Sequence, residues 1–293
     1  MRNSKTIAII FSLMILLWNC TERIDIEVDS SFTRLVVEGY VTTDTAAHWV
    51  RLSTSSDYFY NQTSPLVGGA SLSIYDGEQI HLLTESASEP GMYFTEADFH
   101  GIPGKTYTLR IRDVDIDGNS EMEEYSGSSI LNPVNPVDSI KLRQFSAFDN
   151  KGYEVQIYAW DSPRRDWYAF KVHRNDKLIT DTLSELWVQN DEFFNGNYTY
   201  GITSQFLSMD KPDEILEIGD TVTFEINGIT EEYYNYIIEA QSQIYSQIPL
   251  FSGPPANIRT NMDNGAIGFF VAYAIHRSFT IATEDIVFAS KVK

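Results

Sequence analysis

The chain has 293 residues, of which 43% are hydrophobic and 21% are charged. Its 41 acidic residues outnumber 21 basic ones, and the formal net charge of −20 opposes binding to nucleic acid and to anionic surfaces. The apolar content excludes an intrinsically disordered chain, and the length suffices for one large domain or two ordinary domains with hydrophobic cores.

The N-terminal residues have the pattern of an export signal. Arg2 and Lys5 precede an apolar segment at residues 7–18. That segment is too short to cross a hydrocarbon core of about 30 Å as a helix, but its length is typical of the hydrophobic region of a secretory signal peptide. We therefore expect the protein to be exported.

Cys20, the single cysteine of the chain, follows this segment. Leu17 stands three residues before it, which resembles a bacterial lipobox, although Trp18 and Asn19 occupy positions where small residues are usual. A lone cysteine in an oxidising compartment has no disulfide partner. The sequence predicts a signal peptide at residues 1–19 and lipidation of Cys20, with several acyl chains giving a stable membrane anchor. The alternative is an ordinary signal peptide that is cut elsewhere and leaves an unpaired thiol.

The residues after Cys20 form an acidic tether at 20–30. It resembles the signals that send lipoproteins of the Bacteroidota to the outer face of the outer membrane, whereas the alternative is a plain solvated linker. Without residues 1–19 the chain loses two basic groups and its net charge becomes −22. We expect a lipid-anchored protein of the outer membrane that faces the cell exterior. The acidic residues of the tether are Glu22, Asp25, Glu27 and Asp29.

Apolar residues alternate with polar ones over the next part of the chain. Short segments of this kind are separated by clusters of Gly, Pro, Asn, Asp and Ser, which is typical of an all-β sandwich. In "KTYTLRIRDV" the side chains of Tyr107, Leu109 and Ile111 share one face of a strand. The sequence predicts an immunoglobulin-like or prealbumin-like β-sandwich over residues 31–131. Its expected strands lie at 34–43, 48–55, 70–76, 79–85, 91–97 and 105–114.

Two Asn-Pro pairs in "ILNPVNPVDSI" favour extended or turn conformations and cannot donate to a strand ladder. They predict a linker at 132–138 and a second β-rich domain at 139–293. Strands are expected at 152–161, 166–176, 183–190 and 220–229, and the apolar segment 264–281 predicts a pair of central strands.

One amphipathic helix is predicted at about 230–248. Apolar residues recur there at helical spacing, Thr230 is placed to cap the N-terminus and Pro249 to end the helix. We expect the helix to pack across the second sheet. Its apolar stripe consists of Tyr233, Ile237, Ala240, Ile244 and Ile248.

These features together resemble a known family. The lipobox-like cysteine with its acidic tether, "LVVEGYVTT", "VGGASLSIYD", "PGMYFTEADFHGIPGKTYTLRIR", "NPVDSI" and "PPANIRTNMDNGAIGFFVAY" are similar to the DUF4249 family of Bacteroidota outer-membrane lipoproteins. The resemblance covers nearly the whole mature chain, although its motifs are turns and strands and carry no chemistry. It implies a lipoprotein that is often encoded beside a TonB-dependent transporter, with a suspected accessory role in uptake.

The segment "DVDIDGNSEMEE" at 113–124 fits the acidic pattern of an EF-hand calcium loop. However, Ser120 stands where an aliphatic anchor is needed, and a strand precedes the segment instead of a helix. The favoured interpretation is a β-hairpin with a turn at Asp117 and Gly118, and calcium is the alternative. No other cofactor is predicted. The calcium ligands would be Asp113, Asp115, Asp117, Asn119 and Glu124.

No catalytic motif is evident. The five histidines, His48, His81, His100, His173 and His276, fall in separate segments without zinc-binding spacing. The nucleophile elbow of α/β-hydrolases is also missing. We therefore expect a protein without enzymatic activity.

Aromatic residues in expected loops suggest a contact surface for a protein or a sugar, because exposing large rings is unfavourable. The alternative is that the loops fold back and bury these rings between domains. The candidates are Tyr58, Phe59, Tyr60, Phe193, Phe194 and Phe251.

Four short segments, "DTA", "DSI", "DTL" and "DTV", resemble the O-glycosylation sequon of the Bacteroidota. Asp followed by Ser or Thr also simply favours turns. The acceptors would be Thr45, Ser139, Thr182 and Thr221.

Two functions are consistent with these observations. The first is a surface-exposed outer-membrane lipoprotein that assists a TonB-dependent β-barrel transporter in nutrient uptake. The alternative is an autonomous adhesion module that binds glycan or matrix. Fold analogy cannot separate the two.

Overall fold

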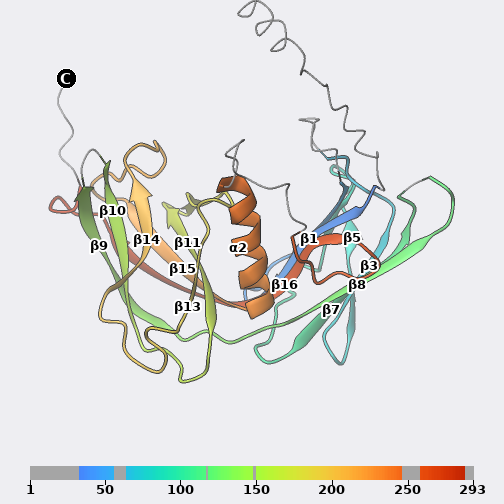
Figure 1. Cartoon of the computed structure of the whole chain (residues 1–293), viewed down its shortest axis with the longest axis horizontal. Coiled ribbons are helices and arrows are strands. Elements are labelled where there is room, and N and C mark those ends of the chain that lie inside the picture. Colours follow the sequence, from blue (N-terminus) through green and yellow to red (C-terminus); the bar gives the residue numbers. More distant parts are fainter. Residues whose placement is uncertain (1–32, 56–63, 117, 148–149, 246–257, 288–293) are drawn as a thin grey trace, which may run out of the picture. The chain divides into compact units, whose positions relative to one another are not determined.

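The computed structural model describes residues 33–55, 64–116, 118–147, 150–245 and 258–287. The predicted signal peptide, Cys20 and the acidic tether lie outside this part of the chain. Residues Thr33–Lys293 form one compact unit. Its described part is mostly β, with 16 strands and one helix, so the fold class expected from the sequence is confirmed (Figure 1).

The first half of the chain forms a β-sandwich. Four of its strands belong to a nine-stranded sheet, and four others form a separate sheet that packs against them. The first group is β1 (Leu35–Thr42), β2 (Trp49–Thr54), β5 (Thr84–Glu85) and β6 (Met92–Phe94). The second group is β3 (Ser71–Tyr75), β4 (Ile80–Leu82), β7 (Thr106–Val114) and β8 (Glu123–Ile130).

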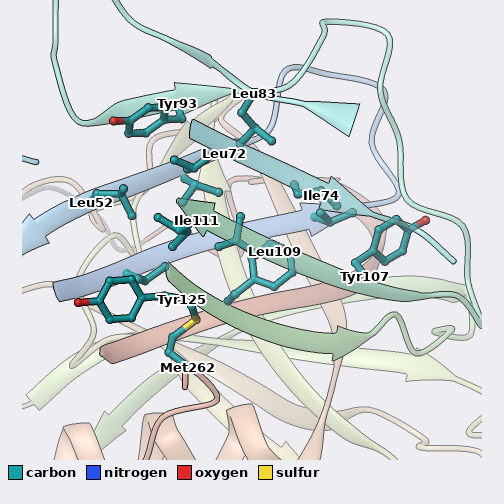
Figure 2. Packing of buried hydrophobic residues seen from close by; sticks show 14 of the residues in the cluster. Leu52, Leu72, Ile74, Leu83, Tyr93, Tyr107, Leu109, Ile111, Tyr125 and Met262 are labelled. Carbon is teal, nitrogen blue, oxygen red and sulfur yellow. The ribbon is translucent and has the colours of Figure 1, made fainter. Parts of the chain in front are cut away.

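The core of this sandwich is formed by alternate side chains along its strands, which point to the same face. Along β7, Tyr107, Leu109 and Ile111 are fully buried while Arg110 is exposed, which confirms the shared face expected from the sequence. Figure 2 shows these side chains meeting Leu72 and Ile74 of β3 between the strands. Tight apolar packing of this kind supplies most of the stabilisation of a sandwich.

The second half of the chain forms another sandwich with its own core. A three-stranded sheet packs against further strands of the nine-stranded sheet. The small sheet contains β9 (Val137–Ala147), β10 (Asn150–Ala159) and β14 (Ile202–Ser208). The strands facing it are β11 (Trp167–Arg174), β12 (Lys177–Leu178), β13 (Trp187–Asn190) and β15 (Thr221–Ile229).

Strand β16 (Ile267–Ile281) joins the two sandwiches (Figure 1). Its first half pairs with β1 in parallel, from Val36 opposite Ile267 to Thr42 opposite Tyr273. Its second half pairs with β15 in antiparallel, from Gly228 opposite Ala274 onward. One continuous strand therefore replaces the two central strands that the sequence suggested for 264–281.

The predicted linker separates the last residue of the first half that lies in the first core, Leu131, from the first residue that lies in the second core, Val137. However, β16 supplies Phe270, Ala272 and Ala274 to the first core, and Ala282, which directly follows β16, lies in the second core. The division into two domains at 132–138 stays a prediction, and the sheet itself runs through both halves.

Helix α2 (Glu231–Tyr245) packs on the face of the nine-stranded sheet that faces away from both cores. Thr230 caps it, because its Oγ1 accepts a hydrogen bond of 3.2 Å from the amide of Tyr233. Ile237 and Ala240 are buried against the sheet, whereas Ile244 is exposed. No helix in the described part of the chain is long and apolar enough to cross a membrane.

Candidate functional site

A hollow of about 590 Å³ lies beside α2 on the outer face of the nine-stranded sheet. Strands β1, β2, β11, β15 and β16 contribute to it, together with α2 and the loop after β1. We call it the tyrosine hollow. Its aromatic lining consists of Tyr40, Trp49, Tyr233, Tyr236, Phe269 and Tyr273.

The alternation of side chains along β16 explains this lining. Phe270 and Ala272 point into the first core, so Phe269 and Tyr273 point to the opposite face. Tyr40 of β1 extends the aromatic lining, with its ring centroid 6.4 Å from that of Tyr273.

The rings pack mainly edge to face or tilted. Tyr40 and Trp49 lie 5.0 Å apart at 76°. On the helix side, Tyr233 and Tyr236 each lie 5.1 Å from Phe269. Such pairs hold one another in place, so the rings that form the walls of the hollow support one another.

A network of charges lies at one side of the hollow. Arg277 Nε donates to Glu225 Oε2 at 2.8 Å, and its two terminal nitrogens donate to the carboxylate of Asp44 at 3.0 and 2.7 Å. The hydrogen bonds that Arg277 donates to Asp44, with the nearby charge of Glu225, raise the pKa of Arg277. The Glu225 side chain is only 4% exposed. This bidentate geometry is typical of a strong ion pair.

Lys171 is the second cation of the hollow. Its Nζ lies 3.8 Å from Glu225 Oε1 and 5.7 Å from the ring centroid of Tyr273. It makes no hydrogen bond to the described part of the chain. An ammonium group has three donors, so all three are open to a partner in the hollow.

The tyrosine hydroxyls add further hydrogen-bonding groups. Burial raises the pKa values of Tyr40, Tyr233, Tyr236 and Tyr273, so these hydroxyls are protonated at neutral pH. Within the residues that the structure describes, the hydroxyls of Tyr233, Tyr236 and Tyr273 have no hydrogen-bond partner.

His48 closes the edge of the hollow. Its side chain is buried, its Nε2 lies 3.0 Å from Thr42 Oγ1, and its amide donates to Thr95 Oγ1 at 2.9 Å. Burial lowers the pKa of His48. The imidazole is therefore neutral at physiological pH and links β2 to β1 and to the residue that follows β6.

A second hollow of about 690 Å³ lies in the first sandwich, beside His81 and Phe99. Acidic groups dominate its rim, and Asp76 is already held by Lys105 Nζ at 3.0 Å and by two backbone amides. Phe99 is the one Phe, Tyr or Trp in its lining, whereas six such rings line the tyrosine hollow, which is therefore the stronger candidate.

The aromatic residues singled out in the sequence do not form this site. Phe193 is 87% exposed, whereas its neighbour Phe194 is buried in the second core. The remaining four, Tyr58, Phe59, Tyr60 and Phe251, lie outside the described residues.

The acidic segment at 113–124 connects β7 and β8, which pair in antiparallel, so the hairpin is confirmed, whereas its predicted turn at Asp117 and Gly118 lies partly outside the described residues. Asp115 accepts hydrogen bonds from the amides of Gly118 and Ser120 at 2.8 and 3.1 Å. Glu124 lies 3.6 Å from Arg112.

Asn119 in the same turn accepts a hydrogen bond from the amide of Glu121 at 2.6 Å, and Asp113 has a left-handed φ of 59°. Asp117 lies outside the described residues. Among those described, no group of three or more His, Cys, Asp or Glu side chains is placed to hold a metal ion. The calcium alternative stays a prediction.

The four candidate glycosylation residues lie at separate places. Thr45, Ser139 and Thr182 are exposed, and Thr221 is half-buried at the start of β15. Glycosylation stays a prediction.

Sequence reasoning missed Lys171, Glu225 and Arg277. A signal was present, because each is a charged residue inside an apolar strand, as in "TVTFEINGI". A charge within such a strand is costly unless it is paired, and three of them indicate a shared site.

The fold defines a β-rich protein of two sandwiches joined by one sheet, with the tyrosine hollow on the sheet's outer face. A family model described as "Domain of unknown function (DUF4249)" matches residues 21–278, and the chain belongs to this family. No curated protein matches the chain.

Among solved structures, the chain is similar to a DUF4785 family protein from Legionella pneumophila, with 12% identity and a TM-score of 0.27. The match covers 68% of this chain and spans 53% of that protein's length. A likeness this distant carries no functional argument.

Proposed function

We propose that this protein is a non-enzymatic binding lipoprotein that is anchored to the outer membrane through Cys20 and assists a TonB-dependent transporter in nutrient uptake. The tyrosine hollow carries the binding part of this proposal. The export signal and lipobox-like cysteine support the anchor, and the family's association with such transporters supports the partner.

The hollow is suited to holding a ligand. Its volume and its mixture of aromatic walls with a few polar groups are typical of small-molecule sites. Asp44 and Glu225 are occupied by Arg277, so neither carboxylate is free for acid-base chemistry. The open groups are Lys171 and the tyrosine hydroxyls, which are suited to hydrogen bonding.

Purification of the native lipoprotein from detergent-solubilised outer membrane tests this function. We expect a β-barrel protein to co-purify in stoichiometric amount. Cys20→Ala should release the protein from the membrane fraction after high-salt and carbonate washing. Reproducible absence of a barrel, or membrane retention of Cys20→Ala, would contradict the corresponding part of the proposal.

A second candidate, an autonomous glycan- or matrix-binding module, is favoured by one observation. Trp160 and Tyr200 are 62% and 80% exposed, and Tyr198 lies between them with ring centroids 5.4 and 4.9 Å away. Tyr200 also has a left-handed φ of 49°, which is strained for a bulky residue. A protein that purifies alone and is retained by an immobilised glycan would support this candidate.

A further inference from the structure

We infer that the ligand of the tyrosine hollow is a neutral sugar, bound as a single ring or a short oligosaccharide. This inference rests on the proposed binding function and specifies its ligand class. It is argued from the charge balance, the open hydrogen-bonding groups and the aromatic walls of the hollow.

The charges of the hollow cancel. Asp44 and Glu225 are matched by Arg277 and Lys171, and Glu38 at the rim is paired with Arg51 at 3.2 Å. A charged ligand would leave one of these groups without its partner. An anionic ligand would in addition meet a chain whose formal net charge is −20. The hollow therefore favours a ligand without net charge.

The open groups of the hollow are free to form hydrogen bonds with a ligand. Lys171 has three donors, and each of the hydroxyls of Tyr233, Tyr236 and Tyr273 both donates and accepts. These groups are distributed around the hollow on β11, α2 and β16. The Lys171 side chain is 28% exposed, so a ligand would take the place of water on it. A ligand with hydroxyl groups around its edge would satisfy several of them at once.

The aromatic walls are suited to the faces of a sugar ring. The faces of Tyr and Trp rings carry partial negative charge, and the C–H groups on a sugar face carry partial positive charge. Tyr40, Trp49 and Tyr273 line one part of the hollow, and Tyr233 and Phe269 line another. A peptide would instead pair its backbone with a strand edge, and the hollow lies on the face of a sheet whose strands there are paired on both sides.

Saturation-transfer NMR on the mature lipoprotein tests the ligand class. The protein would be held in lauryldimethylamine oxide, a detergent without a sugar headgroup. The probes are glucose, galactose, mannose, N-acetylglucosamine, maltose and cellobiose, with glucuronate as the charged counterpart. We expect transfer to at least one neutral sugar and weaker binding of glucuronate than of glucose.

Two variants locate the binding. Lys171→Met should weaken binding of the responding sugar by about tenfold or more, and Tyr273→Phe by about threefold or more, as expected for the loss of a charged and a neutral hydrogen bond. Lys177→Met and Tyr234→Phe make the same chemical changes outside the hollow and should leave affinity unchanged. Tyr273→Phe removes only the hydroxyl and keeps the ring, so we expect this variant to fold. Its circular dichroism spectrum should match that of the native protein.

The failures are distinguishable. No transfer to any of the neutral sugars, or glucuronate binding as tightly as glucose, would overturn the sugar assignment. Equal binding by all four variants would place the sugar outside the hollow and overturn the inference. If glucuronate binds, no neutral sugar does, and Lys171→Met abolishes that binding, the ligand class is wrong while the binding function stands.

Discussion

Arg277 and Asp44 are joined by two hydrogen bonds although 233 positions separate them in the chain. The same guanidinium also bonds Glu225 of the neighbouring strand. One arginine near the end of β16 therefore fixes the loop after β1 against β15, and this contact forms one wall of the tyrosine hollow.

Replacement of Glu225 by Gln should destabilise the protein. The carboxylate neutralises both Lys171 and Arg277 in a place that water hardly reaches, and loss of charged hydrogen bonds of this kind costs about 2 kcal/mol. Urea unfolding of the mature protein measures the change.

Glu38→Gln is the matched control, because the Glu38 side chain is 47% exposed and its one ion pair within the described part of the chain is with Arg51. Exposed ion pairs contribute less than about 1 kcal/mol. Equal losses of unfolding free energy in the two variants would show that burial of Glu225 does not matter.

Replacement of Ile237 by Ala should weaken the packing of α2 on the sheet. Ile237 is completely buried, whereas its neighbour Ile238 is 43% exposed. A large-to-small change in a core costs about 2–5 kcal/mol. Urea unfolding should show a loss in that range for Ile237→Ala and a much smaller one for Ile238→Ala. A reversed order would contradict the orientation of the helix.

Replacement of Gly268 by Ala should disrupt the pairing of β16 with β1. Gly268 has a φ of 93°, and an added Cβ would overlap the carbonyl group of Val37. Gly219 has the same φ but open space around it, so Gly219→Ala reports backbone strain alone, about 1–3 kcal/mol. Thermal unfolding should show a larger loss for Gly268→Ala, and equal losses would argue against the close approach.

His48 should make stability depend on pH. Because burial lowers its pKa in the folded protein, the unfolded chain takes up the proton first as the pH falls through about 6.5. Proton uptake by the unfolded state lowers the free energy of unfolding. The stability contributed by neutral His48 is therefore present above about pH 6.5 and is lost below it.

Unfolding free energies of the native protein and of His48→Gln at pH 7.5 and pH 5, two values that bracket the histidine range at about 6.5, test this. The decrease between the two pH values should be smaller in the variant. It should not vanish, because burial also lowers the pKa values of His173 and His276. An unchanged decrease would show that His48 is not responsible.

The local features of the fold could be predicted from the sequence. Alternation in "KTYTLRIRDV" identified β7 and its buried face, and the apolar stripe with Thr230 identified α2 and its cap. Both depend on residues that are neighbours in the chain. By contrast, the sequence predicted a pair of strands for 264–281, and β16 is instead one strand that continues through Gly268 with a positive φ.

The tyrosine hollow could not be predicted because its parts come together only through long-range pairing. Asp44, Lys171, Glu225 and Arg277 belong to four segments of the chain. Phe193 and Phe194 show the same limit on a smaller scale, since adjacent rings end in opposite environments. Sequence pattern identifies which faces are apolar, and the topology decides which charged residues meet.

The place of β16 in the sheet sets an order for folding. Hairpins such as β7 with β8 and β9 with β10 pair residues that are near in the chain and can form early. By contrast, β1 pairs in parallel with residues 267–273, which are distant in the chain. Closing so long a loop is slow. Both sandwiches therefore need β16 to complete their shared sheet. We expect them to reach the native state in one concerted step.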